Sequence, residues 1–340
     1  MRNVGLMKRA ICTLLVLLLV ALSLGGCGQV SGSDKYEIVC TVFPIYDWVQ
    51  NLLGENEDVS LRLLVNRGTD PHSYTPTPTD IAAIHACDVL IYVGGESDAW
   101  VSDVLKTVKN EDIKIISLLD MLGDRAHLEE TVEGMQCEDD DCHDHEHGHD
   151  HGHDHGHGEE QGAYDEHVWL SLKNARLLCD GLANELCEVT PDMSEQIAEN
   201  SAAYSEKLAV LDARFEETLA EKNERLLIFA DRFPFRYLIE DYSLEYFAAF
   251  SGCSADSEAT FETVVFLSDK LRESGVGVLI ILESSTRDLA DTVISNSGCD
   301  GVEVLVMDSM QSITAKDVDA GASYLSIMEK NLAVISAALK

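Results

Sequence analysis

Residues 59–93 read VSLRLLVNRGTDPHSYTPTPTDIAAIHACDVLIYV and contain a complete strand–helix–strand unit. The apolar runs Val59–Val65 and Val89–Val93 predict two buried strands, and Pro78–Ala86 between them predicts a helix. Thr77 is the expected N-cap of that helix. A strand that is followed by a helix and then by another apolar strand is typical of a parallel sheet with helices on its faces.

The same rhythm of strands and helices continues on both sides of this unit. In the first half, further strands are predicted at Glu37–Phe43 and Ile113–Leu119, with helices at Ile45–Leu53, Ala99–Val108 and Lys173–Leu186. In the second half, the predicted strands are Arg225–Ala230, Glu245–Phe250, Val276–Leu282 and Val302–Met307, and the helices are Pro234–Asp241, Glu258–Glu273, Arg287–Ser295 and Asp317–Leu339. This pattern predicts an α/β fold of two (β/α)4 lobes, each built on a parallel sheet.

A helical segment separates the two halves. Residues 190–222 open with Thr190-Pro191-Asp192, are rich in Ala, Glu and Leu, and contain no Gly or Pro after Pro191. This composition predicts one long helix that joins the lobes rigidly. We therefore expect an N-terminal lobe at 36–189, a linker helix at 190–222 and a C-terminal lobe at 223–340.

The N-terminus has the features of an export signal. Three basic residues precede an apolar run at 10–24, and the following LGGC sequence ends at Cys27 and resembles a bacterial lipobox. We predict a signal peptide at 1–26, cleaved before Cys27, and a flexible tether at 27–35. The lipid on Cys27 would hold an extracytoplasmic protein at the bacterial cell membrane. An uncleaved membrane anchor is the alternative, but about 15 apolar residues are short for a span.

The charge balance is strongly acidic. The chain has 61 Asp and Glu against 24 Lys and Arg, which gives a net charge of −37. Nucleic-acid binding requires a basic surface, so this composition argues against it. An acidic surface is compatible with a cationic ligand.

The cysteines require a decision about disulfides. There are ten, and an exported protein is permitted disulfide bonds. Cys253 with Cys299 and Cys137 with Cys142 are the pairs that we consider, although spacing alone cannot fix the connectivity.

One internal tract has a composition of its own. Residues 137–160 read CEDDDCHDHEHGHDHGHDHGHGEE and contain almost nothing apolar to bury, so we expect them to be disordered without metal. Imidazoles and carboxylates in alternation can chelate divalent cations. The histidines of this accessory metal loop are His143, His145, His147, His149, His151, His153, His155 and His157.

A separate metal site is expected between the lobes. His72 lies in a loop after a predicted strand, and His167 lies just before a predicted helix. Asp231 and Asp308 directly follow strands of the second half. Because open α/β sheets bind ligands at the carboxyl ends of their strands, two imidazoles and two carboxylates could converge on one cation. Such nitrogen and oxygen ligands suit Zn²⁺ or Mn²⁺.

These motifs resemble those of a known family, the zinc/manganese solute-binding lipoproteins of bacterial metal ABC transporters. DPHSYTPTPTDIAAIHACDVLIYVGG resembles the first metal-ligand region of the family, and DEHVWLSLKNA resembles the second. DYSLEYFAAFSG, VMDSMQSIT and YLSIMEKNLAVI resemble segments of the second lobe. The resemblance implies two lobes with one metal held between them, with His72, His167 and Asp308 as ligands. It also implies that the metal passes to a membrane permease powered by a cytoplasmic ATPase.

The sequence departs from this family at one ligand position. Counting back from Asp241-Tyr242 places Arg232 where the family has a His or Glu ligand. A guanidinium cannot bind a metal because it stays protonated. Either Asp231 supplies the ligand, or water or a loop histidine completes the site, or Arg232 forms an ion pair with Asp231 or Asp308. Fewer imidazoles favour Mn²⁺, whereas the histidine tract favours Zn²⁺, which we take as the expected metal.

Three classes of function follow. We expect a monomeric receptor that captures Zn²⁺ for the permease, and not an enzyme, since GxSxG and P-loop motifs do not occur in the sequence. The alternative is a surface metal buffer or adhesin of the same fold that is not coupled to transport. A secreted metallohydrolase would need a general base beside the metal, for which Glu166 is the candidate.

Overall fold

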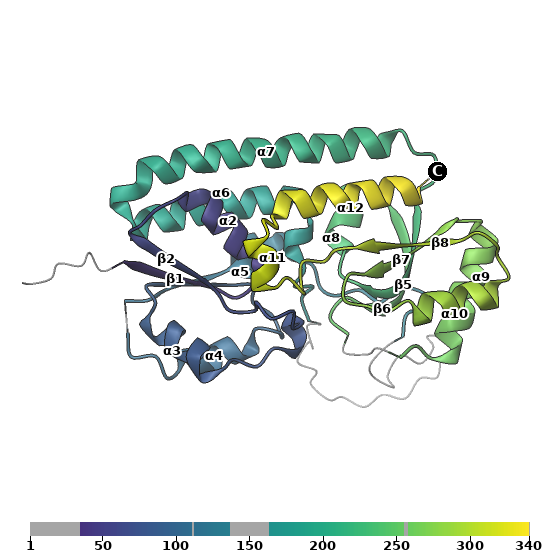
Figure 1. Cartoon of the computed structure of the whole chain (residues 1–340), viewed down its shortest axis with the longest axis horizontal. Coiled ribbons are helices and arrows are strands. Elements are labelled where there is room, and N and C mark those ends of the chain that lie inside the picture. The colour runs from purple at the N-terminus through teal and green to yellow at the C-terminus, as the bar shows by residue number, and fades with distance from the viewer. Residues whose placement is uncertain (1–34, 111, 137–162, 255–257, 340) are drawn as a thin grey trace, which may run out of the picture. The chain divides into compact units, whose positions relative to one another are not determined.

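Two parallel sheets organise the chain (Figure 1). The structure is a computed structural model and describes residues 35–110, 112–136, 163–254 and 258–339. Residues 36–340 form one compact unit that contains two four-stranded sheets, ordered β2-β1-β3-β4 and β6-β5-β7-β8. The paired strands of both sheets run parallel. The predicted α/β fold with two parallel sheets is confirmed.

The first sheet carries helices on both faces. Its strands are β1 (Tyr36–Cys40), β2 (Val59–Leu63), β3 (Val89–Tyr92) and β4 (Lys114–Ser117). Its helices are α2 (Phe43–Leu53), α3 (Pro78–Ala86), α4 (Ala99–Leu105), α5 (Leu118–Leu122) and α6 (Leu172–Val189). Side chains alternate along β1, so Ile38 and Cys40 join the core cluster that contains α2 and α6, whereas Val39 joins the cluster under α3 and α4.

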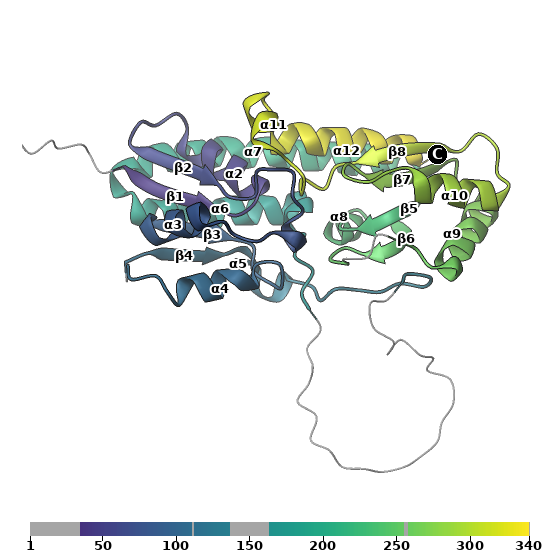
Figure 2. The same ribbon diagram turned by 60° about the horizontal axis from the view of Figure 1, so that its bottom comes forward.

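The second sheet repeats this plan. Its strands are β5 (Leu226–Phe233), β6 (Glu245–Ser251), β7 (Val278–Leu282) and β8 (Glu303–Met307). Its helices are α8 (Arg236–Asp241), α9 (Phe261–Ser274), α10 (Asp288–Ser297) and α12 (Tyr324–Ala338), whereas α11 (Ala315–Asp319) lies against the loop after β2, where the Ala315 N–H donates to the Asn66 carbonyl oxygen. Helices α9 and α10 pack together beside this sheet (Figure 2), and Leu267 and Val293 join a core cluster with Ile228 and Leu279.

Helix α7 (Ser194–Ala220) passes both sheets on the side that also carries α2, α6 and α12 (Figure 1). A 3₁₀ turn at Pro191–Met193 precedes it, and 27 residues without Gly or Pro then form the helix. Its buried face includes Tyr204, Leu208 and Phe215. These side chains belong to one apolar cluster that continues from the first sheet to the second. Burial of a continuous cluster opposes independent motion of the two sheets.

The structure corrects the prediction of one long C-terminal helix. The segment Asp317–Leu339 is divided into α11 and α12, because Gly321 has a φ of 90°, which no helical residue adopts. Ser323 then caps α12 by accepting a hydrogen bond from the Ser326 backbone N–H. Similarly, β4 ends earlier than predicted because Ser117 caps the short helix α5.

Three predictions lie outside the described residues. They concern the signal peptide with Cys27, the histidine tract at 137–160, and the bridge between Cys137 and Cys142. Among the described helices, none combines the length and the apolar character that a membrane crossing needs.

A buried carboxylate in the turn after β3 makes stability depend on pH. Asp98 accepts hydrogen bonds from the Val93 and Gly94 backbone N–H groups at 2.8 and 3.2 Å, and only 7% of the residue is exposed. Burial nevertheless raises the pKa of Asp98 to about 7. The folded state therefore binds this proton more tightly than the unfolded chain, whose Asp has a pKa of about 3.9. The resulting stability is present at low pH and is lost as pH rises through 7.

We expect Asp98→Asn to remove part of this pH dependence. An Asn oxygen can accept the same two N–H bonds without a charge to desolvate. The free energy of unfolding of the metal-free variant should therefore fall less between pH 5 and pH 8, by up to about 2.5 kcal/mol. Urea denaturation at several pH values measures this slope. Asp103→Asn, at an exposed position of α4, is the matched control and should leave the slope unchanged.

Candidate metal centre

His72 is held at the carboxyl end of β2 by a local turn. It lies in a 3₁₀ turn at Pro71–Ser73, and the Asp70 Oδ1 accepts a hydrogen bond from the His72 backbone N–H at 3.0 Å. Burial, followed by the neighbouring His167, lowers the pKa of His72 to about 4. The imidazole is therefore neutral near pH 7, which is the form that binds metals.

His167 is fully buried and is oriented by a carboxylate. Its Nδ1 lies 2.8 Å from the Asp165 Oδ1, which also accepts the His167 backbone N–H at 2.9 Å. Burial disfavours the charged ring, but the hydrogen bond and charge of Asp165, with Glu166 and Glu129, outweigh it and raise the pKa of His167. Because Nδ1 donates to Asp165, the lone pair of the neutral ring is on Nε2.

The two imidazoles meet at a separation that fits a shared ion. The Nε2 atoms of His72 and His167 are 3.3 Å apart. A tetrahedral Zn²⁺ at 2.0–2.1 Å from two nitrogens requires them to be about 3.3–3.4 Å apart. A hydrogen bond between the rings also fits this distance, so the groups around the pair decide what the site can do.

A thiol is the third group at this point. The ligating atoms of His72, His167 and Cys253 all lie within 4.8 Å of one another. Cys253 follows β6, and its backbone N–H donates to the Glu129 carboxylate at 2.8 Å. Burial, followed by the charges of Glu129 and Asp165, raises the pKa of the Cys253 thiol. Two nitrogens and one sulfur form a donor set that suits zinc.

The amide of Gln311 also contacts His167. Its Nε2 lies 3.0 Å from the His167 Nε2, and its Oε1 lies 3.0 Å from the Ser309 hydroxyl. In this orientation, the amide donates to the lone pair that a metal would use. Rotation of the amide by 180° would turn an acceptor oxygen toward the ion instead.

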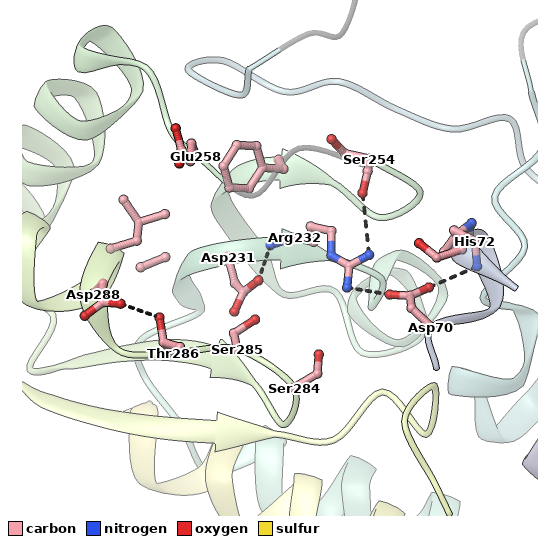
Figure 3. Close-up of a pocket in the computed structure, with 14 residues that line it drawn as sticks. Asp70, His72, Asp231, Arg232, Ser254, Glu258, Ser284, Ser285, Thr286 and Asp288 are labelled. Carbon is pink, nitrogen blue, oxygen red and sulfur yellow. Dashed lines mark hydrogen bonds and ion pairs between the residues drawn. The ribbon is translucent and has the colours of Figure 1, made fainter. Parts of the chain in front are cut away.

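A polar cavity of about 660 Å³ lies beside His72 (Figure 3). Figure 3 shows Arg232 and Asp231 on β5 at one side of it, with Asp70 between Arg232 and His72. The Arg232 guanidinium is 2.6 Å from the Asp70 carboxylate and 3.5 Å from the Ser254 carbonyl oxygen. This ion pair connects the turn after β2 to β5. It also neutralises the positive charge of Arg232, the residue that stands where the family has a metal ligand.

The two predicted carboxylates do not join the imidazoles. Asp231 accepts hydrogen bonds from the backbone N–H groups of Leu282 and Arg232 at 2.9 and 2.8 Å. Asp308 accepts from the Met310 N–H at 2.8 Å, and burial together with Glu283 raises its pKa to about 6. Neither belongs to the group of ligating atoms around His72 and His167 that the described residues form.

Sequence reasoning missed Cys253 as a member of this site and considered it only for a possible bridge with Cys299. Both Cys253 and Cys299 are free thiols, so that bridge is not formed in the structure. Gln311 gave no recognisable signal, whereas Asp165, two residues before His167, could have been found as its orienting partner.

The other two described histidines lie elsewhere. His85 is hydrogen bonded to Thr107 at 2.9 Å, and His127 lies 2.7 Å from the Glu240 carboxylate. Glu166 points away from the imidazole pair toward the Ser97 backbone N–H, at 2.9 Å, so the structure does not place it as a base at the site.

The sequence is similar to proteins of zinc uptake. The family described as ZnuA, Zinc-uptake complex component A periplasmic, matches residues 38–338. The zinc-binding lipoprotein AdcA of Streptococcus pneumoniae is 31% identical over 334 residues, which cover 98% of this chain and 60% of AdcA. The high-affinity zinc uptake system protein ZnuA of Bacillus subtilis is 30% identical over 328 residues, which cover 96% of this chain and 95% of ZnuA. The chain thus spans about 60% of the length of its streptococcal relatives.

Solved structures share the fold. The Zn(II)-bound ZnuA-like domain of S. pneumoniae AdcA superposes with a TM-score of 0.67 at 28% identity, covering 89% of this chain and 98% of that one. The periplasmic zinc-binding protein TroA of Treponema pallidum gives a TM-score of 0.69 at 20% identity, covering 89% and 99%, and shows similarity of fold alone.

We expect Asp165→Asn to lower the pKa of His167, because the hydrogen bond to a charged partner is lost. Asn can still accept the backbone N–H, so the loop should keep its conformation. Nuclear magnetic resonance titration of the imidazole in the metal-free protein measures the pKa. Asp124→Asn, at an exposed position, is the control. An unchanged His167 pKa in Asp165→Asn would contradict the assigned hydrogen bond.

Proposed function

Because this chain belongs to the ZnuA family of zinc-uptake components, we propose that it is an extracytoplasmic receptor that binds Zn²⁺ for import. In this proposal, His72 and His167 hold the ion through their Nε2 atoms. The receptor then delivers the ion to the permease of an ABC transporter, which a cytoplasmic ATPase powers. The protein is a transport receptor and not an enzyme.

The meeting of two imidazoles from separate loops, with a further ligating group beside them, carries the proposal. Their Nε2 atoms are 3.3 Å apart, which fits the nitrogen separation around a tetrahedral zinc ion, and the ligating atoms of His72, His167 and Cys253 lie within 4.8 Å of one another. The hydrogen bond from Nδ1 of His167 to Asp165 fixes the tautomer whose lone pair is on Nε2, where the metal would replace the contact with the Gln311 amide. Burial of His167 excludes water from one side of the ion, which strengthens binding.

The surroundings support entry of a cation. The cavity beside His72 is lined by four carboxylates, those of Asp70, Asp231, Glu258 and Asp288, against the single guanidinium of Arg232. The chain as a whole carries a net charge of −37. A divalent cation is attracted by such a field over about 8–10 Å at physiological salt.

The donor set favours zinc over manganese. Mn²⁺ prefers oxygen ligands, and the two carboxylates that would have supplied them lie outside the group of ligating atoms that the described residues form around His72 and His167. Imidazole nitrogen is a common ligand of Zn²⁺. We therefore propose Zn²⁺ as the transported ion, as the names of the relatives also suggest.

Two further elements complete the proposal. The lipid on Cys27 would hold the receptor near its permease, as the lipoprotein name of AdcA suggests. The histidines of the tract at 137–160 would bind cations with modest affinity and raise their concentration near the site. The lobes at 36–189 and 223–340, joined by 190–222, would present the loaded site to the permease.

We expect the double variant His72→Ala/His167→Ala to lose the tight zinc site and to retain weak, multiple binding by the histidine tract. Isothermal titration calorimetry with zinc separates the two classes of site. The matched control is His85→Ala/His127→Ala, which removes two imidazoles that lie away from the centre. Tight binding that persists in the first variant would refute the proposed ligands.

Uptake by cells separates a transport receptor from a metal buffer. In cells that lack the native receptor, the intact protein should restore accumulation of radioactive zinc at low external zinc, and the His72→Ala/His167→Ala variant should not. If cells with the intact protein accumulate no more zinc than cells without it, although the purified protein binds zinc tightly, the result would favour a metal buffer.

A further inference from the structure

We propose that Cys253 binds the ion as a thiolate, as the third ligand beside His72 and His167. This inference rests on the proposed function, because it concerns the same site. It assigns a ligand from the second lobe to a centre whose two imidazoles both come from the first.

The position of the thiol is the first support. The Cys253 Sγ and the ligating nitrogens of the two imidazoles lie within 4.8 Å of one another, and they are the metal-ligating group that the described residues contain. Cys253 is a free thiol and is partly buried. The Glu129 carboxylate accepts the hydrogen bond of its backbone N–H at 2.8 Å, which anchors the backbone at Cys253.

The preceding glycine brings the thiol close. A Cβ at Gly252 would lie 2.9 Å from the Phe233 carbonyl oxygen and 3.0 Å from the His167 Cε1, and real Cβ atoms rarely come that close to backbone. The absence of a side chain at Gly252 therefore allows the loop to pack directly on the imidazole. The next residue along this loop is Cys253, whose sulfur thus comes beside the Nε2 pair.

The alternatives for the third ligand do not join the two imidazoles. Arg232, at the position where the family resemblance expected a ligand, is paired with Asp70 and cannot bind a metal. Both oxygens of Asp231 accept backbone hydrogen bonds, and Asp308 lies outside the group of ligating atoms that the described residues form around His72 and His167. Cys253, which follows β6, would supply the third ligand that Arg232 on β5 cannot supply.

A thiolate ligand also defines the metal. When the ion binds, the thiol proton passes to solvent and the sulfur donates its lone pair to the metal. Thiolates favour Zn²⁺ over Mn²⁺, which prefers oxygen. Cys253 would therefore be the residue that makes the site discriminate between these two ions.

Cobalt substitution tests the ligand directly, because a Co²⁺–thiolate bond gives an intense near-ultraviolet charge-transfer band that imidazole does not give. The protein from residue 28 onward is used, since the compact unit begins at residue 36. Cys137 and Cys142 are changed to Ser in every sample, so that the tract contributes no thiolate. One equivalent of Co²⁺ should produce the band in this protein and in the Cys299→Ser control, but not in Cys253→Ser.

Zinc affinity gives the second readout. Cys253→Ser should weaken tight zinc binding by about 100-fold or more and reduce the preference for Zn²⁺ over Mn²⁺, whereas Cys299→Ser should change neither. An unchanged charge-transfer band and unchanged affinity in Cys253→Ser would overturn this inference. If His72→Ala/His167→Ala still abolished tight binding in the same series, the proposed function would stand without it. Retention of tight binding by that double variant would instead refute the proposed function.

Discussion

The proposed metal centre depends on the hydrogen bonds that fix Trp169 between the two sheets. Its indole N–H donates to the Ser309 carbonyl oxygen at 3.0 Å, and its own carbonyl accepts from the Tyr324 hydroxyl at 2.6 Å. Trp169 is almost fully buried, and its ring centroid lies 5.4 Å from that of His167. Tyr324 in turn packs edge-on against Trp48 of α2. This chain of contacts ties the loop that carries His167 to both sheets, so the ligand is positioned before any ion arrives.

Electrostatics explains why the centre can remain metal-free and still be ready to bind. Two charged imidazoles at 3.3 Å would repel each other strongly, and burial adds to this cost. The two imidazoles are treated differently. Asp165 favours the charged form of His167, whereas the pKa of His72 is lowered to about 4, so His72 stays neutral. Arg232 does not add to the repulsion, since Asp70 neutralises it. In the proposed site, a divalent ion would bind between His72 and His167 in place of a proton.

The sequence predicts the parts of this structure that local pattern specifies. Apolar periodicity identified the strands, and the capping residues gave α3 its observed bounds, while the loops with His72 and His167 were recognised from their motifs. The direction of a carboxylate is not a local property. Asp231 and Asp308 do follow strands, but neither lies in the group of ligating atoms that the described residues form around His72 and His167. Cys253 was missed because its position depends on packing between a loop after β6 and a distant imidazole, which spacing along the chain does not encode.

The central claim is that two imidazoles from separate loops coordinate one ion. Crystals of the protein soaked in zinc, with diffraction data collected above and below the zinc absorption edge, test it most directly. The account predicts one strong anomalous peak at about 2.0–2.1 Å from the Nε2 atoms of both His72 and His167. Zinc found only at other positions, with the two rings hydrogen bonded to each other, would contradict it.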